Sequence, residues 1–135
     1  DEYRVIYSVY TEKEDAQMVA DKNKPIQIIT KEIDIGDEYA KEIYLSLIDL
    51  IEYADQLEEG LIYEAKLLEA CSIIRLNLDE KKQKLWQEDN ENKYINVLEI
   101  VIGGLSSLNV PGFSRTSLLS DLRYIIISAL MSLPN

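Results

Sequence analysis

The carboxylates between Glu52 and Glu59 are the residues of this sequence whose types and spacing could do chemistry. The motif Glu52-x-x-Asp55 is followed one helical turn later by Glu58 and Glu59. Carboxylates three or four positions apart share one face of a helix. Mg²⁺ is bound in proteins by such oxygens, with water completing its shell. The spacing is therefore compatible with one half of a carboxylate-metal site.

A complete site of this kind needs a second acidic pair on a neighbouring helix, as in some all-helical nucleotide pyrophosphatases. Here the second pair would come from Glu38 and Glu42 or from Glu64 and Glu69, and neither has the required spacing. A solvated helix face, or a face that binds a basic protein, accounts for the same acids without a metal. We therefore expect no metal and no cofactor, and keep a carboxylate-metal all-α hydrolase as an alternative.

Two residue types that many enzymes depend on are missing or scarce. Histidine is absent, which excludes Ser-His-Asp and Cys-His nucleophile systems and His-ligated metals. Cys71 is the single cysteine, so the chain has no intrachain disulfide and no multi-cysteine metal site. It lies in an apolar run, where we expect a small core residue. We expect a protein that is not an enzyme, and an intracellular (cytoplasmic) location because nothing argues for secretion.

The charge of the chain is strongly negative and unevenly distributed. There are 25 acidic and 14 basic residues, which gives a formal net charge of -11, and all acids but Asp121 lie in residues 1–99. Nucleic acids and anionic membranes need neutralising Lys and Arg, so the charge disfavours both as partners. No apolar run reaches the roughly eighteen residues of a membrane span. A protein partner is expected, and a basic one fits the charge.

The N-terminal part, residues 1–36, has extended character at both ends. Residues 3–10 and 26–35 are rich in β-branched and aromatic types, which favours one or two short strands. Thr11 and Glu14 have capping-box spacing, which predicts a short helix over residues 12–21. The strands could pair in parallel through this crossover. The alternative is an extended arm lying on a helical bundle.

Residues 37–133 are expected to form a helical bundle, with a polar loop over residues 87–92 and a turn over residues 109–112. Asp37 is expected to cap a helix that ends near Gly60, because glycine can adopt the left-handed conformation that stops a helix. In residues 61–78, twelve of eighteen positions are apolar and lie nearly all round the helix, which predicts a buried central helix. Asp79 is expected to cap a short polar helix over residues 80–87.

The last third of the chain predicts two more helices. Residues 93–108 form the first, in which Gly103 and Gly104 are expected to admit a close neighbour or a bend. Ser114 or Ser117 is expected to cap the second, which runs to about Leu133. The sequence thus predicts a single mainly α domain over residues 1–135, with four to five helices packed around residues 61–78 and one or two short N-terminal β-strands.

The predicted partner-binding surface combines the acids of the first long helix with nearby aromatic residues. Tyrosine is enriched in protein interfaces, and the chain has nine tyrosines against one phenylalanine. The candidate residues are Glu42, Asp49, Glu52, Asp55, Glu59, Tyr53 and Phe113. The one tight basic cluster, Lys81, Lys82 and Lys84, is expected to be solvated.

One segment resembles a known family. The run Ile43-Tyr44-x-x-Leu47-x-x-Leu50-x-Glu52-x-Ala54 resembles the second-helix pattern of poxvirus Bcl-2-like proteins. Val101-Ile102-Gly103 with Ser107-Leu108-Asn109 is similar to a later helix in some of them. The resemblance implies a non-enzymatic binder of host signalling proteins.

The sequence as a whole favours a non-enzymatic protein-protein interaction domain with an adaptor or regulatory role. An acidic inhibitor or immunity-type protein that binds a basic partner is an alternative, as are a Bcl-2-like viral modulator and the carboxylate-metal hydrolase. Homo-oligomer formation is left open.

Overall fold

The protein is mainly α-helical, as predicted. The computed structural model describes residues 2–9, 27–34, 37–108 and 114–134, with side chains from Asp37 onward. The described residues form four helices: α2 (Glu38–Glu58), α3 (Glu64–Glu88), α4 (Ile95–Ser107) and α5 (Arg115–Ser132). No helix in these ranges is both long and apolar enough to cross a membrane. The helix expected over residues 12–21 lies outside the described residues.

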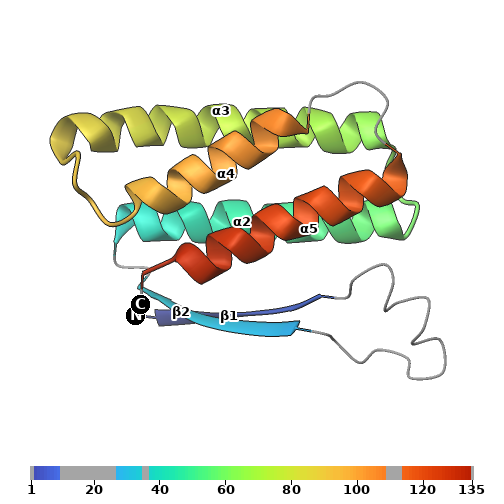
Figure 1. The fold of residues 1–135 in the computed structure, drawn as a ribbon, viewed down its shortest axis with the longest axis horizontal. Helices are drawn as coiled ribbons and strands as arrows, with labels where there is room; N and C mark the ends of the chain where they lie inside the picture. The colour runs from blue at the N-terminus through green and yellow to red at the C-terminus, as the bar shows by residue number, and fades with distance from the viewer. Residues whose placement is uncertain (1, 10–26, 35–36, 109–113, 135) are drawn as a thin grey trace.

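The four helices run alternately up and down and form a bundle (Figure 1). Each helix packs against the next along the chain, and α5 packs against α2, so the contacts close into a ring. In the view of Figure 1, α4 and α5 cross in front of α3 and α2. Leucines from facing helices, such as Leu47, Leu98 and Leu122, are fully buried between them. Buried apolar surface of this kind is the main force that holds the bundle together.

Two strands lie along one side of the bundle. Strand β1 (Glu2–Val9) pairs with β2 (Gln27–Asp34) in antiparallel register, from Glu2 opposite Asp34 to Val9 opposite Gln27. Strand β2 contacts α2 and α5 (Figure 1). The pairing is therefore not the parallel one that the sequence allowed. An antiparallel pair needs only a chain reversal, whereas a parallel pair needs a crossover along the whole strand.

The ends of α2 follow the local signals in the sequence. The Asp37 carboxylate accepts hydrogen bonds from the backbone N–H groups of Tyr39 and Ala40, at 2.9 and 3.1 Å. At the other end, Gly60 has φ of 77° and its N–H donates to the Leu57 carbonyl at 3.1 Å. The next N–H, of Leu61, reaches back to the Gln56 carbonyl at 2.8 Å. This is the Schellman pattern, and it confirms Gly60 as the break between the first two helices.

The prediction of a buried central helix over residues 61–78 is wrong. Helix α3 buries one side only, through Leu67, Ala70, Cys71, Leu78 and Leu85. The apolar side chains of Leu61, Ile73 and Leu76 are more than half exposed. A helix in a ring of four contacts its neighbours along one face, so apolar residues on its other faces meet water.

Helix α3 also continues past Asp79 to Glu88, so the predicted separate helix over residues 80–87 is not a separate element. The Asp79 carboxylate accepts a hydrogen bond from Gln83 Nε2 at 3.1 Å, one turn further along the same helix. No glycine or proline interrupts residues 64–88. Asp79 therefore supports the helix surface instead of starting a new helix.

Candidate partner-binding surfaces

Four of the predicted acids form one exposed surface, three of them on α2 and the fourth, Glu59, at the C-cap that follows it. Asp49, Glu52, Asp55 and Glu59 are all exposed, and we call these four residues the acidic face. They follow one another at intervals of three or four residues, so a single side of the helix carries them. The buried residues of α2, such as Leu47 and Leu50, lie on the opposite side. Packing of the apolar stripe into the core thus turns the acids outward.

Asp55 lies where the acidic face meets α5. Partial burial raises the pKa of Asp55 above its ordinary value, whereas Arg123 of α5 acts to lower it. The carboxylates of Glu58, Glu59 and Glu52 raise this pKa further. Like charges held close together disfavour the ionised form of each other. Among the described residues, the Asp55 carboxylate therefore lies near like charges on its own helix and near one positive charge, Arg123, on α5.

Glu58 is not counted in the acidic face, because two arginines of α5 donate hydrogen bonds to it. The Arg123 guanidinium donates a hydrogen bond to the Glu58 carboxylate, and Arg115 donates one to the Glu58 backbone carbonyl. The last carbonyls of a helix lack partners within that helix, so Arg115 satisfies one of them from outside. Glu58 thus connects the end of α2 to α5.

Glu42 lies apart from the other predicted acids. It is half-buried and lines a shallow groove between α2 and α3, with Asn77, Glu80, Lys81 and Lys84. Glu42 therefore shares this groove with two lysines and one acid of α3, in contrast to the acids of the acidic face.

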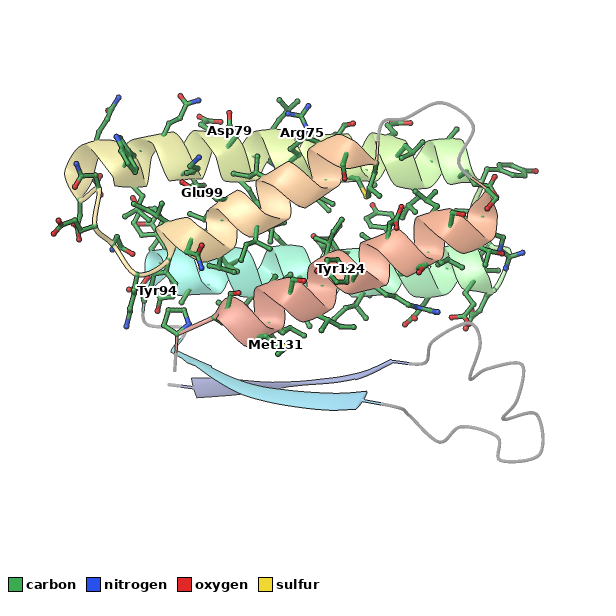
Figure 2. All side chains as sticks on the ribbon, viewed as in Figure 1. Arg75, Asp79, Tyr94, Glu99, Tyr124 and Met131 are labelled. Carbon is green, nitrogen blue, oxygen red and sulfur yellow. The ribbon has the colours of Figure 1, made fainter. Side chains whose placement is uncertain are left out.

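The lysine cluster of α3 does not act as one basic surface. Lys81 and Lys84 line the groove toward α2, whereas Lys82 forms an ion pair with Glu99 of α4, at 3.6 Å from Nζ to Oε1. Figure 2 shows Glu99 between α3 and α4. The sequence could not reveal this division, because it depends on which helix packs on each side of α3.

Of the two aromatic residues in the predicted surface, one is half-buried and the other lies outside the described residues. Tyr53 is half-buried and packs against the hydrophobic core, so it is a residue of the core boundary. Phe113 lies outside the described residues.

Cys71 is a buried core residue, as predicted. Burial raises the pKa of its thiol to about 12, so the thiol stays protonated at neutral pH. A protonated, buried thiol is a poor nucleophile.

Two further surface grooves were not predicted from the sequence. One lies between α3 and α4 and contains the only tryptophan, Trp86, which is about half exposed. The other lies between α4 and α5 and is lined by Ile100, Gly104, Ser107, Asp121, Tyr124, Ile125 and Ser128. Tyr124 is 72% exposed, and Figure 2 shows it on the outer side of α5. Neither groove could be found without knowing which helices are neighbours.

The metal-site hypothesis receives no support from the side chains that the structure places. Among the described residues, no three acidic or cysteine side chains come together in a way that could hold a metal ion. Glu52 and Asp55 therefore meet no acidic pair from a second helix in this part of the chain.

Comparison with protein-family models, with curated proteins and with solved structures finds no match for this chain. The resemblance to Bcl-2-like proteins therefore rests on the quoted residues alone, and the surfaces described above are the basis for a functional proposal.

Proposed function

We propose that this chain is a non-enzymatic protein-binding domain with an adaptor or regulatory role, and that its acidic face binds a basic partner. The observation that carries the proposal is the alignment of four exposed carboxylates, Asp49, Glu52, Asp55 and Glu59, along one side of the bundle. Partial burial raises the pKa of Asp55, and the neighbouring carboxylates raise it further, whereas Arg123 acts to lower it. Positive charges on a partner would relieve the repulsion among Glu52, Asp55 and Glu59. Binding would therefore improve the electrostatic energy of the face itself.

The distribution of charge over the helices supports this choice of surface. Helix α2 carries six acids and one base, whereas α3 carries five of each. Helices α4 and α5 together carry two acids and two bases. The excess negative charge of the bundle thus lies on α2, where it would steer a basic protein toward the acidic face. A rigid helix also presents the acids at little entropic cost to binding.

The acidic inhibitor or immunity-type protein is a specific form of the same proposal, with a basic enzyme as the partner. The Bcl-2-like modulator differs in that an apolar groove would carry the binding. The carboxylate-metal hydrolase would need divalent cations. Millimolar Mg²⁺ or Mn²⁺ should raise the melting temperature if a metal site exists, since a ligand that binds only the folded state stabilises it.

The proposal can be tested with a fluorescent helical peptide rich in Lys and Arg. We expect its affinity for the protein to fall steeply as NaCl is added, because salt screens exposed charges. The triple variant Glu52→Gln, Asp55→Asn and Glu59→Gln should bind about tenfold more weakly, since each exposed ion pair contributes about 0.2 to 1 kcal/mol. Capture from the native host with wild type and this variant would then identify the partner.

A matched control separates the acidic face from net charge alone. The variant Glu64→Gln, Glu69→Gln and Glu80→Gln removes the same number of negative charges, three, but removes them from α3. It should bind the peptide nearly as well as the wild type. Equal losses in the two triple variants, or binding that does not depend on salt, would contradict the proposal.

A further inference from the structure

Arg123 of α5 reaches the C-terminal end of α2, where the acidic face also ends. Its guanidinium forms an ion pair and a hydrogen bond with the Glu58 carboxylate. The Arg123 side chain is 17% exposed, whereas the Glu58 side chain is 54% exposed. Packing of α5 against α2 therefore keeps the arginine largely buried, while much of the Glu58 side chain stays accessible from outside.

Glu58 belongs to the same acid-rich end of α2 as two members of the acidic face. It follows Asp55 by three positions and directly precedes Glu59. Residues three apart on a helix lie next to each other on its surface. Without Arg123, the Glu58 carboxylate would therefore add a fifth negative charge beside the four of the acidic face. The fold instead pairs this carboxylate with a cation from another helix.

The charge of Arg123 also acts on the acidic face itself. Partial burial raises the pKa of the Asp55 carboxyl, whereas the positive charge of Arg123 acts to lower it. A cation that favours the carboxylate form is one that attracts this carboxylate. A Lys or Arg of a partner would compete for the same attraction and would be repelled by Arg123. Because the fold already holds Arg123 in place, the arginine does not bear the entropic cost of association that a partner bears.

We propose that Arg123 is an internal competitor of the basic partner: it pairs with Glu58, keeps this residue out of the acidic face and so lowers the affinity of the face for Lys and Arg. This inference rests on the function proposed above, because it concerns the regulation of the same surface. Loss of the arginine would leave five neighbouring carboxylates open to the partner in place of four.

The fluorescent helical peptide rich in Lys and Arg tests the inference when its affinities for wild type and Arg123→Gln are compared. Glutamine keeps part of the arginine stem that packs on α2 and removes the charge. We expect the peptide to bind this variant about two- to fivefold more tightly, the range that exposed charge interactions give. The gain should be largest at low salt. Arg123→Met, whose unbranched side chain also fills the place of the stem, repeats the test with a second neutral residue.

Two controls separate competition at Glu58 from a change of net charge. Lys84→Gln removes one positive charge from an exposed position on α3 and should change the affinity by less than about twofold. In a Glu58→Gln background, Arg123→Gln should bring a smaller gain than in the wild type, because the carboxylate that it would release is no longer there. Circular dichroism of the full chain checks that each variant keeps its helices.

The outcomes distinguish this inference from the function on which it rests. Salt-dependent binding to the wild type with no gain in Arg123→Gln or Arg123→Met would overturn the inference and leave the proposed function standing. An equal gain in Lys84→Gln, or an undiminished gain in the Glu58→Gln background, would do the same. A peptide that binds neither the wild type nor the variants in a salt-dependent way would overturn both.

Discussion

Gly104 of α4 and Ile125 of α5 lie so close that a Cβ atom on Gly104 would be 2.6 Å from Cγ1 of Ile125. Two further atoms of Ile125, Cδ1 and Cγ2, would lie at 3.0 and 3.2 Å. Ile125 is buried and branched at Cβ, so it has few rotamers into which it could retreat. The close contact between α4 and α5 thus depends on glycine, which has no side chain, at position 104.

This contact predicts opposite effects for two adjacent glycines. Gly104→Ala should destabilise the protein by about 1 to 2 kcal/mol, because overpacking a core contact outweighs the better helix propensity of alanine. Gly103→Ala should stabilise it by up to about 1 kcal/mol, since only the propensity changes. Urea unfolding at concentrations where the chain is monomeric would measure both. Equal effects of the two substitutions would mean that the helices are not packed as described.

The two sides of α3 should respond very differently to truncation. Leu78 is 2% exposed and Leu76 is 57% exposed, although they are two positions apart on the same helix. Leu78→Ala should cost about 2 to 5 kcal/mol of unfolding free energy, because it leaves a cavity in the core. Leu76→Ala should change stability by less than about 0.5 kcal/mol. A large loss of unfolding free energy in Leu76→Ala would contradict the exposure of Leu76 and would support a central, buried α3.

The contrast between Leu78 and Leu76 also shows where sequence reasoning succeeds and fails. The caps at Asp37 and Ser114 and the break at Gly60 were predictable, because each depends on backbone groups within about four residues. The burial of α3 was not predictable, since the number of apolar residues in a helix does not tell how many neighbouring helices will cover it.

The same reasoning applies to the candidate surfaces. The acidic face was predictable because helical spacing alone aligns its residues. The contact between Glu58 and Arg123 joins residues 65 positions apart, and the groove beside Tyr124 needs α4 and α5 to be neighbours. Both follow from tertiary packing, and no local signal in the sequence indicates them.

Cys71 should behave as a probe of unfolding. Its thiol is buried and its pKa is raised to about 12, so hardly any thiolate is present at neutral pH in the folded protein. We expect a thiol reagent such as dithionitrobenzoate to label the native chain slowly, at a rate set by opening of the structure. The same reagent should react rapidly in urea. Fast labelling of the native chain would show that Cys71 is accessible, which would contradict its place in the core.

Asp55 gives a prediction about pH whose sign follows from its environment. Its pKa is raised in the folded protein, mainly by partial burial and against the effect of Arg123. The folded state therefore holds the proton more tightly than the unfolded state does, and ionisation of Asp55 weakens the fold as pH rises through its pKa values. Asp55→Asn should then stabilise the protein at neutral pH by no more than about 1 kcal/mol, because the site is largely exposed. This gain should disappear below the pKa of the unfolded aspartate, where the native carboxyl is also neutral.

Thermal unfolding at a series of pH values would measure this gain in stability, with Asp49→Asn on the same helix as the control. A loss of stability in Asp55→Asn at neutral pH would show that attraction to Arg123 outweighs burial and crowding, and would remove the electrostatic argument for a basic partner at the acidic face.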